Sequence, residues 1–235
     1  MLISHLHRFI YMKTFKTAGT SVELYFERWC TDPAGEYHAR HERDAEVTRW
    51  GIIGARGQQF FPGRTWYNHM PASRVRELIG PEFWNQYYKF CVVRHPFDKM
   101  VSSFWHHLPE TARRELQHAC FDTVRGRFHE WLQTAEHPMD REVFIIGGRP
   151  AMNRIVFYED LCAGLEAVCR DLGLSWEPSR LGRYKSDTRV RDEPYVQYYD
   201  RPSAELVRDL YGWELQHFQY AAPPTPGKVS GEVSA

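Results

Sequence analysis

A short run of small, hydroxyl-bearing and basic residues near the amino end of the chain could bind an anion. The run consists of Phe15, Lys16, Thr17, Ala18, Gly19, Thr20 and Ser21. Small residues let the backbone curl so that several N–H groups converge on one ligand, and a helix beginning near Thr20 would add its positive dipole. The hydroxyls are donors, and Lys16 carries a full charge. The run therefore suits a phosphate-like group, although a capped helix beside a solvated lysine would look the same.

The order of residues in this first loop differs from that of the nucleoside triphosphate loop. That loop has the pattern G-x-x-x-x-G-K-[ST], with its lysine after the glycines and a hydroxyl for magnesium. Here Lys16 precedes Gly19. We therefore expect Lys16 at the end of a strand, where it could reach the bond that is broken.

A second candidate element follows the clearest predicted strand, Tyr87 to Val93. Arg94 comes directly after this strand, and Pro96 opens a helix that carries Ser102. The planar guanidinium of an arginine suits a phosphate. Asp98 and Ser102 are four residues apart, so they share one face of the helix. An arginine paired with an acid, and a surface serine, would be the structural alternative.

Together, the two elements resemble the sulfotransferases that use PAPS (3′-phosphoadenosine 5′-phosphosulfate) and release PAP. They are similar to the carbohydrate sulfotransferases of the family 2 type, which carry a Pro-Lys-Thr-Ala-Gly-Thr-Ser loop. The resemblance implies that Lys16–Ser21 hold the 5′-phosphosulfate, that Lys16 stabilises the leaving oxygen, and that no metal is needed. It also implies that Arg94 and Ser102 hold the 3′-phosphate. The likeness extends from about Phe9 to Tyr220 and includes a Tyr-Glu-Asp-Leu sequence at residues 158–161.

Two positions of the first loop depart from the family pattern. Phe15 stands where the family usually has proline, and Lys13 stands where a histidine is frequent. These departures affect the turn from strand to loop but remove no charged or hydroxyl group.

His69 is the candidate for the base that takes the proton of an acceptor hydroxyl, because an unperturbed imidazole titrates near neutrality. In related glycan sulfotransferases a histidine of this region is the base, whereas other relatives use a glutamate. A helix-capping or buried histidine is the structural alternative. The other histidines lack a third ligand at a spacing typical of metal sites, so no metal site is predicted.

The segment from Arg180 to Arg191 is predicted to be a basic loop. Lys185 or Arg183 could close over the nucleotide, so Lys185 is included among the candidate nucleotide-binding residues. Alternatively, the charges could bind an anionic acceptor such as an acidic glycan, or could simply be solvated.

The pattern of apolar residues predicts an α/β protein with a P-loop-like, three-layer fold, in which helices flank a central parallel sheet. Residues 1–220 are expected to form one domain, and residues 221–235 a disordered tail. The middle stretch, Thr31 to Phe61, is expected to be irregular. The expected strands are Arg8–Met12, Thr65–His69, Tyr87–Val93 and Arg154–Tyr158. Helices are expected after Ser21, Pro71, Pro96 and Tyr158, near Glu110–His118 and Phe121–Gln133, and around Leu206–Tyr211.

Charge and composition exclude several classes of protein. The 235 residues include 30 Lys and Arg against 30 Asp and Glu, so no overall field would collect nucleic acid or a membrane surface. No apolar run is long enough to span a bilayer, and we expect neither a signal peptide nor a membrane anchor. The five cysteines form no C-x-x-C motif. We therefore expect a soluble, cytoplasmic protein.

The family resemblance thus implies an enzyme that moves a sulfuryl group from PAPS to an acceptor hydroxyl, on a carbohydrate, by in-line transfer. Two alternatives remain at this point. One is a P-loop kinase acting on a small molecule, and the other is a non-catalytic module that binds PAP. The sequence does not give the oligomeric state.

Overall fold

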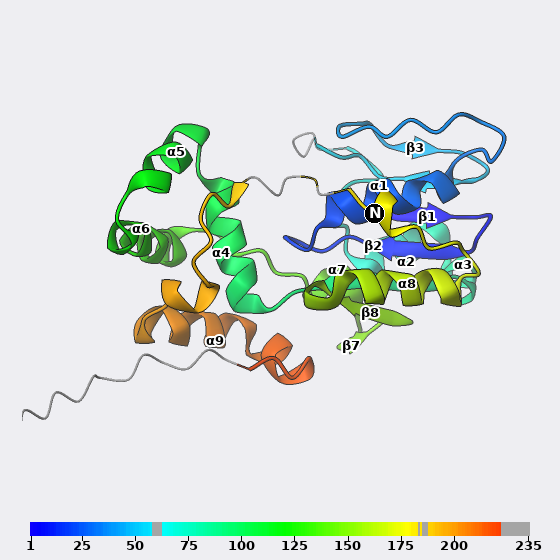
Figure 1. Ribbon diagram of the computed structural model, residues 1–235. Helices are drawn as coiled ribbons and strands as arrows, with labels where there is room; N and C mark the ends of the chain where they lie inside the picture. Colours follow the sequence, from blue (N-terminus) through cyan, green and yellow to red (C-terminus); the bar gives the residue numbers. More distant parts are fainter. Residues whose placement is uncertain (58–62, 183, 185–187, 222–235) are drawn as a thin grey trace, which may run out of the picture. The chain divides into compact units, whose positions relative to one another are not determined.

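The computed structural model describes residues 1–57, 63–182, 184 and 188–221 of the chain (Figure 1). Contacts between residues gather in two compact units. The first unit takes in Met1–Arg94 and Pro138–Lys185, and the second takes in His95–His137 and Ser186–Ala235. The single domain expected over residues 1–220 stays a prediction, and nearly all of the expected tail lies outside the described residues.

A six-stranded sheet forms the centre of the first unit, with the strand order β3-β4-β1-β2-β5-β8. Its strands are β1 (Leu2–Ser4), β2 (Phe9–Met12), β3 (Glu46–Val47), β4 (Gly51–Ile53), β5 (Tyr88–Val93) and β8 (Arg154–Phe157). Strand β5 pairs in parallel with β2 on one side and with β8 on the other. Strands β1, β4 and β3 extend this parallel core with antiparallel pairs. The predicted α/β class is therefore confirmed, with a mixed rather than wholly parallel sheet.

Helices cover both faces of the sheet, as the three-layer prediction requires. Alternate strand residues such as Phe9, Phe90 and Val92 point to one face, where they pack against α1 (Gly19–Phe26) and α8 (Leu161–Asp171). Lys89 points to the opposite face and donates from its Nζ to the carbonyl oxygen of Trp84 at 2.8 Å. That face carries α2 (Ala72–Ile79) and α3 (Pro81–Gln86).

Two expectations for the middle of the chain are wrong. No strand forms at Thr65–His69, because the backbone turns there and His69 has a left-handed φ of 59°. Conversely, β3 and β4 form within the stretch that was expected to be irregular. Gly51 begins β4, and a Cβ on it would lie 2.3 Å from the carbonyl oxygen of Ile3. The glycine thus allows a close approach of two strands, whereas from the sequence alone a glycine here indicates an interruption of regular structure.

The second unit is helical in its described part. Its helices are α4 (Pro96–His107), α5 (Glu110–His118), α6 (Phe121–Thr134) and α9 (Arg201–His217), with the 3-10 helix η5 (Tyr195–Tyr198). An aromatic core that includes Phe104, Trp105 and Phe128 holds them together. The indole of Trp105 donates to the hydroxyl of Tyr198 at 3.2 Å. Asp200 caps α9 through a capping box with Ser203.

Short elements complete the chain. They are α7 (Arg141–Phe144), the strands β6 (Ile145–Ile146) and β7 (Arg149–Pro150), and the 3-10 helices η1 (Glu27–Cys30), η2 (Tyr158–Asp160) and η3 (Pro178–Arg180). Strands β6 and β7 pair as an antiparallel hairpin in the first unit.

Candidate active site

The loop between β2 and α1 has a backbone shape that suits an anion. Lys16 and Ala18 are both left-handed, with φ of 59° and 55°. Ala18 is the N-cap of α1 and is followed directly by helical Gly19. A left-handed residue beside a helical one turns successive N–H groups to the same side, as in anion-binding nests. The first N–H groups of α1 also have no acceptor within the helix, and its dipole is positive at this end.

Buried hydrogen bonds hold this β2–α1 loop from behind. The hydroxyl of Thr14 donates to the carbonyl oxygen of Val92 in β5 and lies 2.8 Å from the hydroxyl of Thr17. Thr17 is fully buried. Its hydroxyl therefore shapes the loop, and any contact that Thr17 makes with an anion would come from its backbone N–H. The N–H of Phe15 donates to Oδ1 of Asp140 at 2.8 Å.

Arg94 lies against the β2–α1 loop. Its Nη1 donates to the carbonyl oxygen of Lys16 at 2.8 Å, and its guanidinium carbon lies 4.1 Å from the ring centre of Tyr158. Only 9% of Arg94 is exposed. The contact follows from the topology, because β2, β5 and β8 are adjacent parallel strands whose carboxyl ends meet at one edge of the sheet. Residues from three distant parts of the sequence thus meet at this edge.

His69 also lies beside the loop. Its Nδ1 is 3.1 Å from the carbonyl oxygen of Lys13, and its ring stacks on that of Phe15 with the centroids 3.8 Å apart. A carbonyl can only accept, so Nδ1 carries the proton and Nε2 has the lone pair. Burial, together with the charges of Lys13 and the Met1 α-ammonium, lowers the pKa of His69 to about 3. The imidazole is therefore neutral at physiological pH.

The other residues of the predicted loop lie at the start of α1. Thr20 and Ser21 are both buried, and the Ser21 hydroxyl accepts from the N–H of Tyr184 at 3.2 Å. Tyr184 is thus fixed to the first turn of α1. Lys185 is the next residue, and both Lys185 and Arg183 lie outside the described residues.

The described arginines of the predicted basic loop are paired with acids. Arg180 lies 3.4 Å from Glu177, Arg189 lies 3.0 Å from Asp98, and Arg191 contacts Glu193. Since these charges are compensated, they offer little support for binding of an anionic acceptor.

Ser102 lies on α4 in the second unit and is half-buried. Asp98, one turn earlier on α4, accepts from Arg189. The predicted role of Ser102 beside Arg94 stays a prediction.

A buried cluster of charges lies beneath the loop. Glu23 of α1 is fully buried and pairs with Lys13 at 2.6 Å, with Arg56 at 3.4 Å and with the Met1 α-ammonium at 2.6 Å. These cations outweigh the effect of burial and lower the pKa of the Glu23 carboxyl to about 2. The carboxylate is therefore ionised and fixed. Glu23, Asp140 and Tyr158 were not predicted from the sequence, since their contacts with Lys13, Phe15 and Arg94 arise only in the tertiary structure.

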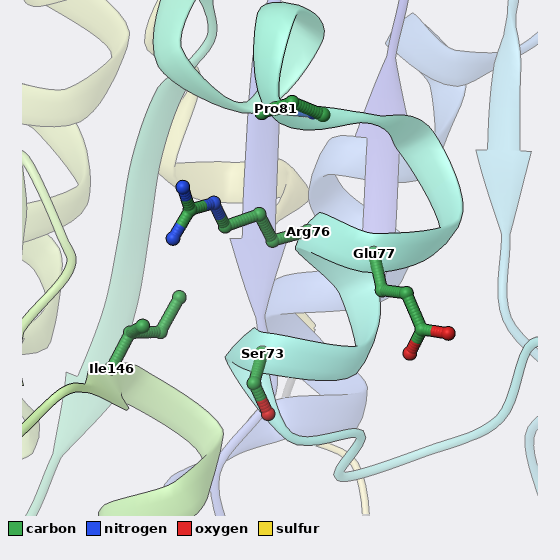
Figure 2. Close-up of a pocket in the computed structure, with 5 residues that line it drawn as sticks. All are labelled: Ser73, Arg76, Glu77, Pro81 and Ile146. Atoms are coloured by element: carbon green, nitrogen blue, oxygen red, sulfur yellow. The ribbon is translucent and has the colours of Figure 1, made fainter.

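Figure 2 shows a shallow depression elsewhere on the first unit, with a volume of about 280 Å³. The lining residues are Ser73, Arg76, Glu77, Pro81 and Ile146. The guanidinium of Arg76 extends toward Ile146, whereas the carboxylate of Glu77 points away from it. One wall of the depression is α2, which begins three residues after His69. None of the predicted site residues lines it.

Across the ranges that the structure describes, no three His, Cys, Asp or Glu side chains are grouped in a way that could hold a metal ion. Among the described helices, none has both the length and the apolar character needed to cross a bilayer.

Comparison with known proteins identifies the family. Residues 1–221 match the model of the Sulfotransferase family. Because this match covers nearly the whole chain, the chain belongs to that family, whose general chemistry is the transfer of sulfuryl groups. A search of curated proteins and a search of solved structures each gave no match.

Proposed function

We propose that the protein transfers the sulfuryl group of PAPS to a hydroxyl group of a carbohydrate acceptor. The main support is the 2.8 Å hydrogen bond from Arg94 to the carbonyl oxygen of Lys16. It joins the two stretches of sequence that the family resemblance assigns to the two phosphate ends of PAPS. Membership of the Sulfotransferase family supports the chemistry of transfer.

The residues present fit a doubly phosphorylated nucleotide. The β2–α1 loop combines the amino end of α1 with the charge of Lys16, which suits the 5′-phosphosulfate. Arg94 brings a second, nearly buried cation beside the same loop. Two cationic subsites fit a ligand with phosphate at both the 5′ and the 3′ position better than a nucleoside monophosphate.

In the proposed reaction, bound PAPS supplies the sulfuryl group. The acceptor oxygen forms a bond to sulfur while the bond from sulfur to the 5′-phosphate oxygen breaks. Lys16 stabilises the negative charge that develops on that phosphate oxygen. Nε2 of His69 takes the proton of the acceptor hydroxyl. The neutral state of His69 suits this role, and the negative charges of a bound nucleotide would raise its low pKa toward a more useful value.

The acceptor in this proposal also contacts the depression along α2. Ser73, Arg76 and Glu77 provide hydrogen-bonding groups, and Pro81 and Ile146 provide apolar surface. Arg76 lies about 6 Å along the axis from the start of α2, which itself follows His69 closely. We propose that an acceptor whose hydroxyl lies at His69 continues along this helix.

The kinase alternative is less well supported, because Lys16 precedes Gly19 instead of following the loop glycines. A non-catalytic PAP-binding module would keep the same phosphate contacts and differs only in turnover. Activity measurements therefore separate the three functions.

The test is a transfer assay with PAPS labelled in its sulfate, a panel of polysaccharides and, as a competing donor, ATP. We expect transfer from PAPS and none from ATP. Lys16→Ala should abolish transfer and leave PAP binding measurable by calorimetry, whereas Arg149→Ala, which removes an exposed positive charge on β7, should change neither. Transfer from ATP alone would favour the kinase, and PAP binding without turnover on any acceptor would favour the binding module.

A further inference from the structure

The side chain of Lys13 forms the floor of the β2–α1 loop. Lys13 follows β2 directly, and only 5% of it is exposed. A Cβ placed on Gly19 would lie 2.8 Å from its Cε and 2.9 Å from its Cγ. The loop thus rests on the lysine stem, and the space that a side chain at Gly19 would need is already filled.

Lys13 also holds the segment that carries His69. Its carbonyl oxygen accepts from Nδ1 of His69 at 3.1 Å, and its Nζ lies 3.4 Å from Oδ1 of Asn68. One residue therefore contacts both the loop and the candidate base, through its side chain and its backbone.

Glu23 fixes the position of Lys13. Its Oε2 accepts from Nζ of Lys13 at 2.6 Å, and both groups are buried. Glu23 lies on α1, the helix whose amino end forms part of the candidate site. The ion pair therefore connects the end of β2, the helix that follows the loop, and His69.

We propose that Lys13, anchored by Glu23, is a positioning residue that holds the β2–α1 loop and His69 in one fixed arrangement for transfer. The role in transfer rests on the proposed function, whereas the arrangement itself does not. Lys13 stands where a histidine is frequent in the family. The ion pair of Lys13 with Glu23 therefore departs from the usual family pattern.

The charge of Lys13 provides a readout that a merely structural role would not affect. The charged groups that act on His69 are the Lys13 ammonium and the Met1 α-ammonium, which lower its pKa, and the Glu23 carboxylate, which raises it. Removal of the Lys13 charge should therefore raise the pKa of His69, and removal of the Glu23 charge should lower it further.

The experiment compares Lys13→Met with Glu23→Gln and with the matched control Lys89→Met. Methionine keeps most of the lysine stem beneath Gly19, and Glu23 retains Arg56 and the Met1 α-ammonium, so the first variant should fold. Lys89 is also a buried lysine of the first unit, but it bonds the carbonyl oxygens of Trp84 and Tyr87 instead of the loop. The measurements are kcat, the dissociation constant of PAP, and the titration of His69 by NMR, assigned with a His69→Gln variant.

We expect kcat to fall more than about tenfold in Lys13→Met and in Glu23→Gln, because small displacements of reacting groups are costly. The midpoint of the His69 titration should move up in the first variant and down in the second, and Lys89→Met should change neither quantity. If both variants change kcat and the His69 titration no more than the control, the proposal is overturned. If the wild-type protein transfers nothing from PAPS, the proposed function fails, but PAP binding and the His69 titration still decide whether Lys13 positions the site.

Discussion

Replacement of Arg94 by alanine should weaken the binding of PAP far more than that of AMP, which lacks the 3′-phosphate. The guanidinium has two observed tasks: it donates to the carbonyl oxygen of Lys16, and it lies over the ring of Tyr158. The proposed function adds a third task, contact with the 3′-phosphate. The first two affect the loop and hence both nucleotides, whereas the third affects PAP alone.

The size of each effect can be worked from these contacts. A hydrogen bond from a charged donor contributes about 1.5–3 kcal/mol. Loss of the hydrogen bond to the carbonyl oxygen of Lys16 should lower nucleotide affinity by only part of this energy, since Asp140 and Thr14 still hold the loop. We therefore expect AMP to bind up to about tenfold more weakly to Arg94→Ala. Loss of the proposed contact between Arg94 and the 3′-phosphate, which contributes about 2–3 kcal/mol, should weaken the binding of PAP by a further factor of about 30–150.

The assay is calorimetric titration of PAP and AMP into the wild type and Arg94→Ala at one salt concentration. Tyr158→Leu serves as the matched control, because it removes the ring and keeps the guanidinium. Tyr158→Leu should bind both nucleotides more weakly to a similar extent, with a loss of binding free energy of no more than about 2 kcal/mol. An Arg94→Ala variant that keeps the wild-type preference for PAP over AMP would remove Arg94 from the 3′-phosphate site and refute the reasoning.

Four further predictions concern His69, Ala18 and Arg76. His69→Gln should lower kcat by a factor of about 10²–10⁴. Since the pKa of His69 is about 3 when folded and 6.5 when unfolded, only the unfolded chain gains this proton as the pH falls from 6.5 toward 3, so stability falls. In His69→Gln, the free energy of unfolding should fall less over this pH range, as measured by urea unfolding at several pH values. An unchanged dependence of the free energy of unfolding on pH would contradict this prediction. Ala18→Gly should stabilise the protein by about 0.5–1 kcal/mol in the same assay, because it relieves a left-handed alanine, and destabilisation would contradict it. Arg76→Ala should raise the KM of the acceptor several-fold without changing the affinity for PAP. An unchanged KM would show that the depression does not bind the acceptor.

The sequence predicted those elements whose apolar pattern is strong and local. Strands β2 and β5 and helices α4 and α8 form where the periodicity of apolar residues indicates, because each buries one continuous face. The β2–α1 loop was predictable for a different reason, since its small residues and single lysine suit an anion wherever the chain places them.

The parts that were missed depend on contacts between distant residues. The stretch that ends at His69 is rich in aromatic and β-branched residues, which favoured a strand, but its contacts with Lys13 and Phe15 hold it in a turn instead. The short β4 depends on a close approach to β1 that only a glycine permits.

The contacts among the charged residues of the site were also not predictable from local sequence. Lys13 and Glu23 are ten residues apart in the sequence, and nothing local to either residue shows that they form a buried pair. Tyr158 meets Arg94 because β8 and β5 are parallel neighbours that end at the same edge of the sheet. Asp140, at the start of α7, meets Phe15 although 125 residues separate them. The sequence therefore indicates candidate ligand-binding residues more readily than the buried residues that hold those candidates in place.

The most direct measurement is a crystal structure of the protein with PAP bound. The proposed function predicts the 5′-phosphate at the amino end of α1, within hydrogen-bond reach of Lys16, and the 3′-phosphate within reach of the Arg94 guanidinium. A nucleotide bound with both phosphates away from the β2–α1 loop, or with its 3′-phosphate far from Arg94, would contradict it.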